Sequence, residues 1–343
     1  MKIDILSFTA RGYALAERIH TTFTERPPQL SNGAPRLTMT VARCNEPLSL
    51  TEWTTQMFDQ SDALVFVGAA GIAVRSVAPH LKNKALDPAV VVVDEGGRFA
   101  IPILSGHLGG ANDLARRIGE ICGSLPVITT ATDVSGKFAV DEWARRQNFA
   151  LLEPERILPV SARILKGETV TVTSDFPISG ACPSGVRLAE DGFVKVGICR
   201  DESSALHLVP GIGVLGVGCK RGTTRETLEA VFEEFCIQNR FYPECVAEAA
   251  SIDVKADEPG LLEFCKAHGW NFTTFPAEAL AEVPGEFSDS AFVEKTVGVG
   301  CVCERAAVLG SRGGLIFRKY AKCGVTMALA VRSCEPDWRW QYE

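Results

Sequence analysis

The sequence predicts an α/β protein: two α/β domains with mostly parallel sheets, joined by a smaller β-rich middle segment. Short β-branched apolar runs such as "ALVFV" and "AVVVV" alternate with stretches whose apolar residues recur at helical spacing. Runs that are apolar throughout are typical of parallel strands with helices on both faces. A chain of 343 residues, 46% of them hydrophobic, is long enough for two or three such domains.

The N-terminal α/β domain is predicted over residues 1–148. Its expected strands and helices follow one another in this order: strand 3–8, helix 12–23, strand 63–67, a glycine-containing turn and a helix, strand 89–93, strand 98–104, helix 111–122 and a strand from 126. Ligands gather at the carboxyl ends of the strands in parallel sheets. Several of the loops that follow these strands could therefore share one crevice: 68–71, 94–97, 105–110 and 129–133. The glycines at 96 and 97 favour a tight hairpin turn into strand 98–104.

Residues 149–208 are predicted to form the middle segment. They contain short strand-like pieces, "ETVTVTS" and "GFVKVGIC", together with prolines and no convincing long helix. The strand and helix alternation resumes in the C-terminal domain, predicted over residues 209–343. Its expected elements are strand 214–219, helix 223–236, strand 247–254, helix 258–269, strand 271–275, a short helix from 276 and two strands within 314–331.

Composition excludes several classes of protein. The net charge of −7 disfavours a broad nucleic-acid surface, and no apolar run approaches the ~18 residues of a membrane helix. The opening "MKIDILSF" predicts a buried strand rather than a signal peptide. The twelve cysteines include no C-x-x-C, so we expect reduced thiols in a cytoplasmic protein, nearly all of them small buried hydrophobes. No ligand spacing supports a zinc or other metal site.

The stretch "ILSGHLGGANDLARRIGEICG" sets His107 between Gly106 and the pair Gly109–Gly110, just before a predicted helix. The unpaired N–H groups of a helix N-terminus suit an anion, and Asn112 lies in its first turn. An imidazole can act as acid or base near neutrality. A structural histidine is an alternative of about equal weight.

The stretch "TTATDVSGKFAVDEWA" places Asp133 at a probable strand end and Lys137 in the next turn. A carboxylate near His107 could orient its ring, although Asp133 fits a turn-forming role equally well. Asp141 precedes "EWARR" and is predicted to be a helix N-cap.

In "GVLGVGCKRGTTRETLEA", a strand leads through Lys220, Arg221, Gly222 and Thr223 into a helix. Backbone N–H groups and two cations make an anion receptor, while a solvated basic turn is the alternative. The stretch matches neither the P-loop nor G-x-G-x-x-G, so nucleotide binding is poorly supported. Thr223 and Glu226 fit a capping box.

The loop in "ASIDVKADEPGLLEF" adds Ser251 and Lys255 at a strand end, where they hint at ligand contact, and Asp257 as the N-cap of the next helix. Near the end of the chain, Glu304 and Lys322 lie at possible strand ends.

Five motifs occur in one order: "LSGHLGGANDLA", "PVITTATDVSGKFAVDEWA", "GIGVLGVGCKRGTT", "ASIDVKADEPGLLEF" and "KCGVTMALAV". Together they resemble the cobalt-precorrin-5A hydrolases of anaerobic cobalamin biosynthesis, over about residues 50–330. The resemblance implies an enzyme that opens the δ-lactone of cobalt-precorrin-5A and releases acetaldehyde to give cobalt-precorrin-5B, with contraction of the corrin ring. It implies no cofactor, because the substrate carries the cobalt. It also implies transient contact with neighbouring pathway methyltransferases.

Such chemistry needs an activated water and groups that hold carboxylates. The candidate catalytic residues are His107 as general base, Asp133 and Ser105. Whether water attacks directly or an enzyme nucleophile attacks first stays open. The candidate substrate-binding residues are Gly106, Gly109, Gly110, Asn112, Lys137, Lys220, Arg221, Gly222, Thr223, Ser251 and Lys255.

Two alternative functions remain at this point. One is a non-catalytic carrier that binds a corrinoid intermediate. The other is a phosphate- or nucleotide-binding enzyme, supported only by the two glycine-rich loops.

Overall fold

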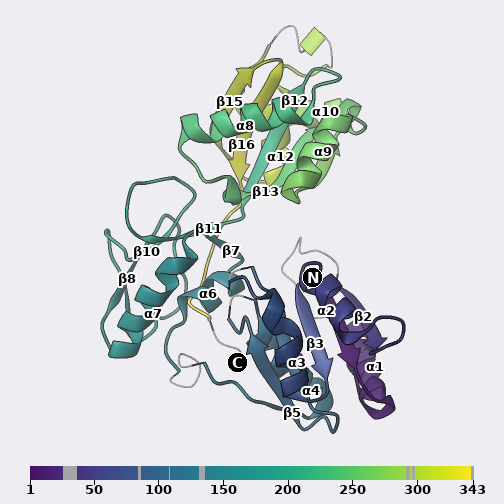
Figure 1. The fold of residues 1–343 in the computed structure, drawn as a ribbon. Helices are drawn as coiled ribbons and strands as arrows, with labels where there is room; N and C mark the ends of the chain where they lie inside the picture. The colour runs from purple at the N-terminus through teal and green to yellow at the C-terminus, as the bar shows by residue number, and fades with distance from the viewer. Residues whose placement is uncertain are drawn as a thin grey trace. The chain divides into compact units, whose positions relative to one another are not determined.

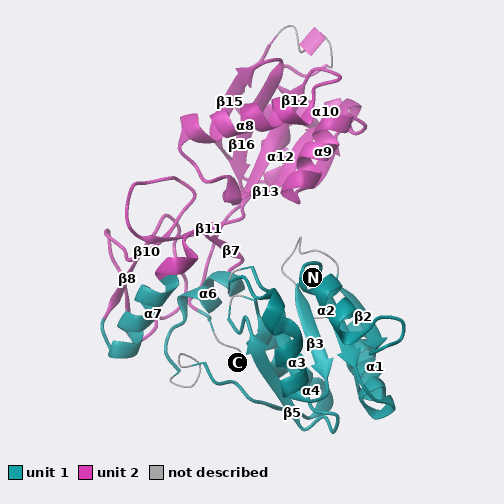
Figure 2. Cartoon of the chain, viewed as in Figure 1, with its two compact units in different colours: residues 1–146, 157–168, 339–343 teal, residues 147–156, 169–338 magenta. Residues whose placement is uncertain are grey.

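The computed structural model describes residues 1–25, 37–83, 86–107, 109–130, 136–290, 294–295 and 298–340. The strands within these ranges form three sheets, which occupy residues 2–126, 149–210 and 213–331 (Figure 1). The predicted α/β class is confirmed. The chain divides into two compact units (Figure 2). Unit 1 comprises Met1–Arg146, Ile157–Glu168 and the residues from Arg339, and unit 2 comprises Gln147–Arg156 and Thr169–Trp338.

The sheet of unit 1 has six strands in the order β2-β1-β3-β4-β5-β6. Its strands and the helices around it are β1 (Lys2–Ser7), α1 (Ala10–Glu25), β2 (Thr38–Arg43), α2 (Leu50–Phe58), β3 (Ala63–Val67), α3 (Ala70–Val77), a 3₁₀ turn (Ala78–His80), β4 (Ala89–Val93), β5 (Phe99–Leu104), α4 (Ala111–Cys122) and β6 (Leu125–Pro126). Helices α1 and α4 pack on one face, and α2 and α3 pack on the other. This double cover explains why β3 and β4 are buried at every position.

The direction of β5 decides where His107 lies. Strands β1, β3 and β4 are parallel, whereas β5 pairs antiparallel with β4, and β6 pairs parallel with β5. The loops after β3 and β4 therefore lie at one end of the strands, and the loop after β5 lies at the opposite end. The predicted hairpin turn at Asp94–Gly97 is confirmed, and it divides the loops into two sets at opposite ends of the strands, so not all of them can share one crevice.

Unit 1 also contains α6 (Val140–Arg146) and α7 (Ile157–Lys166). The expectation that residues 149–208 contain no long helix is wrong. Helix α7 buries Ile157, Val160 and Ile164, which recur at helical spacing. Pro159 obscured this pattern, but a proline within the first turn of a helix removes no intrahelical hydrogen bond.

The first sheet of unit 2 has five short strands in the order β7-β11-β10-β8-β9. Their bounds are β7 (Phe149–Leu151), β8 (Val170–Ser174), β9 (Val186–Leu188), β10 (Val194–Val196) and β11 (Leu206–Pro210), with a 3₁₀ turn at Pro154–Arg156. The strands pair parallel except for β7, which runs antiparallel to β11. This sheet is the predicted β-rich segment.

The second sheet of unit 2 has the order β14-β13-β12-β16-β15. Its elements are β12 (Gly213–Cys219), α8 (Arg225–Asn239), a 3₁₀ turn (Pro243–Cys245), β13 (Val246–Ile252), a 3₁₀ turn (Asp253–Lys255), α9 (Pro259–His268), β14 (Asn271–Phe275), α10 (Ala277–Ala281), α12 (Val302–Ser311), β15 (Gly314–Lys322) and β16 (Val325–Val331). Strands β12, β13 and β14 are parallel, and β16 pairs antiparallel with both β12 and β15.

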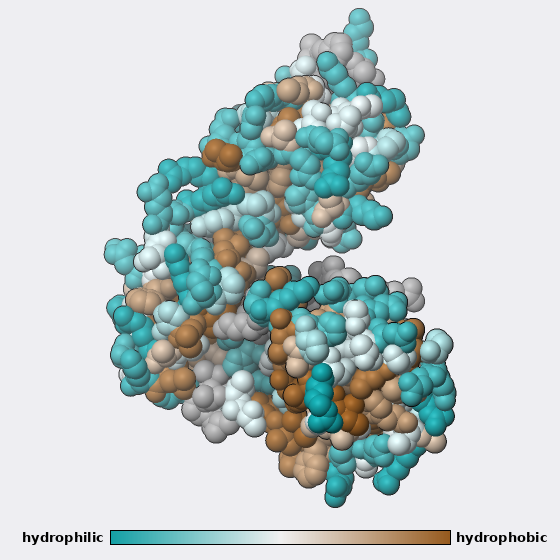
Figure 3. Space-filling model, in the orientation of Figure 1, coloured by the Kyte–Doolittle hydropathy of each residue, from teal (hydrophilic) through white to brown (hydrophobic). Residues whose placement is uncertain are grey.

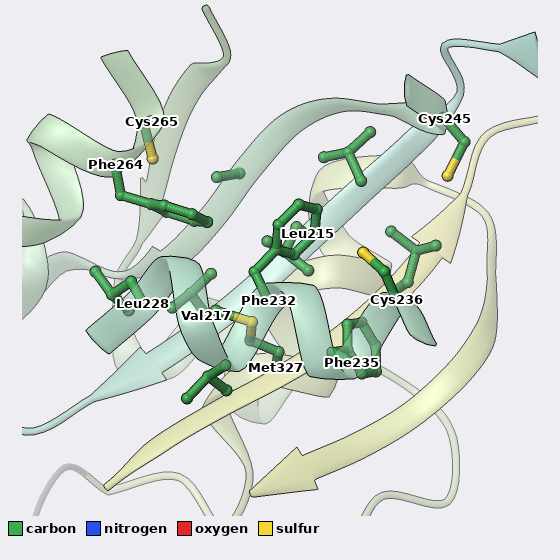
Figure 4. Packing of buried hydrophobic residues seen from close by; sticks show 14 of the residues in the cluster. Leu215, Val217, Leu228, Phe232, Phe235, Cys236, Cys245, Phe264, Cys265 and Met327 are labelled. Atoms are coloured by element: carbon green, nitrogen blue, oxygen red, sulfur yellow. The ribbon is translucent and has the colours of Figure 1, made fainter. Parts of the chain in front are cut away.

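The main core of unit 2 lies between this sheet and helices α8 and α9 (Figure 4). Leu215 and Val217 of β12 point toward Leu228 and Phe232 of α8. The alternate residue Val214 faces the opposite side, where α10 and α12 pack. The alternation of the strand thus separates the two cores.

Helix α12 was not predicted, and Glu304, expected at a strand end, lies in its first turn. The helix packs unusually close to β12 at Gly216, where a Cβ atom would lie 1.8 Å from the carbonyl oxygen of Cys303. Only glycine permits this approach.

Two predicted helix caps are displaced by one residue. The N-cap of α8 is Thr224, whose side chain accepts from the N–H of Thr227, so the capping box at Thr223 is wrong. The N-cap of α9 is Glu258 rather than Asp257, with Pro259 as the first helical residue.

On the face shown in Figure 3, hydrophobic residues, coloured brown, reach the surface beside hydrophilic ones, coloured teal. Leu86, Leu158 and Leu125 are among the most exposed. No helix among the residues that the structure describes combines the length and the apolar composition that crossing a membrane requires.

We predict that Gly216→Ala destabilises unit 2 by about 3 kcal/mol, because the added methyl group separates α12 from β12. The urea midpoint measured by circular dichroism checks this value. Gly314→Ala is the matched control, since no atom lies within 4 Å of its added Cβ. Equal midpoints for the two variants would contradict the prediction.

Candidate functional site

The loop after β5 folds tightly onto the start of α4. The N–H of Ala111 donates to the Ser105 carbonyl at 3.2 Å, and the N–H of Asn112 donates to the Gly106 carbonyl at 3.0 Å. A Cβ on Gly109 would lie 2.4 Å from the Cβ of Ser105. The close packing of the loop itself therefore accounts for Gly109.

The imidazole of His107 lies between two carboxylates. Its Nδ1 is 3.3 Å from Asp141 Oδ2, and its Nε2 is 3.7 Å from Glu142 Oε2. The three side chains are 12%, 9% and 2% exposed. The prediction that Asp141 is an N-cap is wrong: α6 begins at Val140, so Asp141 is a helical residue, and its carboxylate faces the ring.

Two arginines extend this network. Arg116 lies 3.7 Å from Glu142 and 2.9 Å from Asp113, which also pairs with Arg145. We call the following six residues the histidine cluster: His107, Asp113, Arg116, Asp141, Glu142 and Arg145. Among these residues, three carboxylates and two guanidinium groups surround the imidazole. Charges this far from water need such pairing.

Ser105 and Asn112 lie near this cluster but have structural partners. Ser105 Oγ donates to the carbonyl of Asp87 at 2.9 Å. Asn112 is buried, and its Nδ2 donates to Thr130 Oγ1 at 3.1 Å. Ser105 thus connects the loop after β5 to the segment before β4, and Asn112 connects α4 to the segment after β6.

Lys137 is engaged with α7, because its Nζ donates to the carbonyl oxygens of Ile164 and Leu165 at 3.1 and 2.9 Å. A lysine at the C-terminal end of a helix also complements the helix dipole. Asp133 lies outside the described residues, so its predicted role at His107 stays a prediction.

Unit 2 contains a pocket of about 800 Å³ beside the ends of β12 and β13 and the start of α12. We call it the cationic pocket. Its lining residues include five cations, Lys220, Arg221, Lys255, Lys319 and Lys322, and no aspartate or glutamate among the described positions that line it. Three of the predicted binding residues, Lys220, Arg221 and Lys255, thus come together.

Four of the five cations have partners. Arg221 lies 3.4 Å from Asp257, and Lys255 lies 2.9 Å from Glu258. Lys322 and Glu234 are 2.6 Å apart. The Nζ of Lys319 donates to the carbonyl of Ser288. These contacts hold the side chains along the pocket wall.

Lys220 differs from the other four. Its ammonium group has no ion-pair partner within the described part of the chain, and its methylene stem packs against Gly324. A lysine in this setting carries uncompensated charge that a bound anion can neutralise.

Three other predicted binding residues form hydrogen bonds within the protein near the pocket and do not line the pocket itself. The N–H of Gly222 donates to Glu258 Oε1 at 2.7 Å, and Thr223 Oγ1 donates to the carbonyl of Lys220. Ser251 is fully buried, and its hydroxyl donates to the Val217 carbonyl at 2.7 Å.

Glu258 connects the segments beside the pocket through its hydrogen bonds to Gly222 and Lys255. Burial raises the pKa of its carboxyl group, but hydrogen bonds from Lys255 and from the Gly222 N–H outweigh burial and leave the pKa below its usual value. The carboxylate therefore stays ionised and ties the turn after β12 to the 3₁₀ turn after β13.

All twelve cysteines are free thiols. Five are buried, whereas Cys182, Cys199 and Cys323 are exposed, so the expectation of nearly all buried thiols holds only in part. Burial raises the pKa of Cys236 and Cys265 to about 12.

Cys301 and Cys303 line the cationic pocket, with 3.9 Å between their sulfur atoms. The hydrogen bond from the Cys303 thiol is the largest cause that lowers the pKa of Cys301. The same bond and burial raise the pKa of Cys303. The two neighbouring thiols are therefore unequal, and Cys301 is the more acidic.

Sequence reasoning missed Lys319 and Cys301 and gave Lys322 no role. Lys322 has a local signal, because it directly precedes the turn between β15 and β16. Lys319 lies three residues earlier, where strand alternation alone would place it on the opposite face. Their proximity to Lys220 depends on the long-range pairing of β16 with β12. In the described part of the chain, no cluster of histidine, cysteine and carboxylate side chains is arranged to hold a metal ion.

Two families described by their role in cobalamin synthesis match this chain. The family "Cobalamin synthesis G N-terminal" matches residues 52–133, and "Cobalamin synthesis G C-terminus" matches residues 213–330. The first range includes His107, and the second includes the lining residues of the cationic pocket.

Curated relatives match most of the chain. The cobalt-precorrin-5A hydrolase of Salmonella typhimurium is 37% identical over 80% of this chain and 84% of that protein. The enzyme of the same name from Priestia megaterium is 31% identical over 80% of each chain. A crystal structure of a cobalamin biosynthesis protein G homologue from Sulfolobus solfataricus covers 96% of this chain and 97% of that chain, with 23% identity and a TM-score of 0.42. On the two family matches and the curated relatives, the chain belongs to the cobalt-precorrin-5A hydrolase family.

Proposed function

We propose that this protein is a cobalt-precorrin-5A hydrolase. It opens the δ-lactone of a cobalt tetrapyrrole and releases acetaldehyde to give cobalt-precorrin-5B in anaerobic cobalamin biosynthesis. The observation that carries this proposal is the similarity to curated hydrolases over four fifths of the chain. The same similarity disfavours the carrier alternative, since those relatives are named as enzymes.

The cationic pocket is the proposed binding site for the substrate. A cobalt-precorrin bears many acetate and propionate carboxylates, and a protein of net charge −7 needs a local positive surface to hold them. Five cations with no carboxylate among the described lining residues supply that surface. Cobalt enters as part of the substrate, so we propose no further cofactor.

His107 is the proposed proton-transfer residue. With a carboxylate beside each ring nitrogen, His107 is the proposed general base that takes a proton from the attacking water and then delivers it to the leaving alkoxide when the lactone opens. The carboxylates of Asp141 and Glu142, one at each ring nitrogen, stabilise the imidazolium that forms between these two transfers. Water is the proposed nucleophile, because the Ser105 hydroxyl is held by the Asp87 carbonyl.

The proposal also covers the location of the enzyme in the cell and its contacts with other enzymes. We place the enzyme in the cytoplasm, in transient contact with the methyltransferases that act before and after it. Such contacts would limit the exposure of a labile intermediate.

The direct test is the release of acetaldehyde. The purified protein mixed with cobalt-precorrin-5A should release one acetaldehyde per substrate, measured by coupled NADH oxidation with alcohol dehydrogenase. A carrier protein would bind the substrate and release none.

We predict that His107→Asn lowers kcat by about 10²–10⁴ and leaves KM unchanged, because the variant cannot transfer the proton. Steady-state kinetics of acetaldehyde release check this prediction. His20→Asn, on α1, is the matched control and should behave as wild type. Normal kcat in the His107 variant would remove this residue from the mechanism.

We predict that Lys220→Gln raises KM about tenfold with little change in kcat, since one charge-assisted hydrogen bond of about 1.5 kcal/mol is lost. Lys322→Gln should raise KM less, because Glu234 already neutralises that lysine. Lys266→Gln, on α9 and outside the pocket, is the control. An unchanged KM for Lys220→Gln would argue against the cationic pocket as the binding site.

A further inference from the structure

The turn between β15 and β16 lies against the end of β12. The last pair in the ladder of β12 and β16 is Cys219 and Val325, and the N–H of Lys220 donates to the Gly324 carbonyl at 3.1 Å. This hydrogen bond continues the antiparallel ladder by one residue into the turn. Lys220 and Gly324 are therefore directly opposed across the two strands.

Two alternate pairs at this end of the ladder each combine a glycine with a larger residue. A Cβ on Gly218 would lie 2.6 Å from Oγ1 of its partner Thr326, and a Cβ on Gly324 would lie 2.9 Å from Cδ and 3.0 Å from Cε of Lys220. Residues two apart on a strand share a face, so both pairs lie on the same side of the sheet. All four residues line the cationic pocket. In both pairs, one side chain occupies the space that a side chain on the glycine would need.

The turn by itself explains only part of the requirement for glycine at position 324. The φ angles are +50° at Cys323 and +78° at Gly324, and positive φ at both central residues is the pattern of a type I′ hairpin turn. Asparagine also adopts this left-handed conformation. An asparagine would satisfy the turn, but its Cβ would collide with the stem of Lys220. The contact with Lys220 is therefore a second requirement, which the turn does not impose.

We propose that Gly324 is a positioning residue for the binding of substrate. Because it leaves room for the methylene stem of Lys220, it fixes the direction in which that lysine presents its ammonium group to a carboxylate of the macrocycle. The inference rests on the proposed function, since the tetrapyrrole must occupy the cationic pocket. In this role Gly324 acts through Lys220 and not on the ligand.

Lys220 is the lining cation that most needs such support. Contacts with acidic side chains or with a backbone carbonyl hold the other four cations. In the described part of the chain Lys220 has no ion-pair partner, and the contact with Gly324 restricts its rotamers instead. A side chain that is already ordered loses less conformational entropy when it binds a carboxylate.

The test adds a Cβ at position 324 in a residue that the turn tolerates. Gly324→Asn should raise the KM for acetaldehyde release about fivefold with kcat unchanged, because the displaced lysine must be ordered again on binding. The affinity for hydrogenobyrinic acid, a metal-free corrin with free carboxylates, should fall by the same factor in isothermal titration calorimetry.

Gly269→Asn is the matched control. Gly269 also has a positive φ, +68°, but no atom lies within 4 Å of its added Cβ, and it lies at the end of α9 outside the pocket lining. Both variants should have the same urea midpoint, and only Gly324→Asn should change KM.

A double-mutant cycle shows whether the effect passes through Lys220. Lys220→Ala removes Cγ, Cδ and Cε, which are the atoms that an added Cβ at position 324 would meet. This variant should raise KM about tenfold, and Gly324→Asn added to it should raise KM no further. A general disturbance of the pocket by the asparagine would raise KM by the same factor in both backgrounds.

The outcomes separate this inference from the proposed function. If Lys220→Ala weakens binding but Gly324→Asn leaves KM and corrin affinity unchanged, or acts equally in both backgrounds, the positioning role is wrong and the pocket stands. If Lys220→Ala changes neither KM nor corrin affinity, the pocket assignment fails together with the role of Gly324. If the wild-type protein binds the corrin but releases no acetaldehyde, the proposed reaction is wrong, and the corrin affinities of the variants decide the role of Gly324.

Discussion

The contact between α12 and β12 is the constraint on which the cationic pocket depends. Because Gly216 has no side chain, the carbonyl group of Cys303 in α12 can approach the backbone of β12 closely. This approach sets the first turn of α12 beside the end of β12, where Lys220 begins the next turn. A larger residue at position 216 would move the thiols and the helix terminus away from the cations. The close packing of α12 against β12 at Gly216 therefore determines which side chains line the pocket.

Buried carboxylates complete the frame of the cationic pocket. Glu258 joins the turns after β12 and β13, and Glu304 joins the segment at Ser288 to β15 through the Lys319 N–H. Both groups are almost inaccessible to solvent, and donors around each favour its charged form. The two buried carboxylates thus stabilise the segments around the pocket, and the lining lysines and arginine are the groups proposed to bind the substrate.

Local patterns predicted much of the fold, including α4 with its bounds of residues 111–122. They also singled out Lys220, Arg221 and Lys255, because loops at the carboxyl ends of adjacent parallel strands meet. The errors came from information that local patterns lack. The approach of β15 depends on an antiparallel neighbour. Helix α6 begins two residues before the start that a cap at Asp141 implies, which turns the predicted cap into a partner of His107.

The uncompensated charge of Lys220 has a kinetic consequence. A polyanion approaching a protein of net charge −7 meets repulsion from the protein as a whole and attraction from the pocket, and both are screened over about one Debye length, ~8 Å at physiological ionic strength. The macrocycle is therefore drawn in only when it is near and has its acidic rim turned toward the lysines. Added salt shortens the reach of both forces, and it changes the rate of capture more than the rate of escape from the closely held complex.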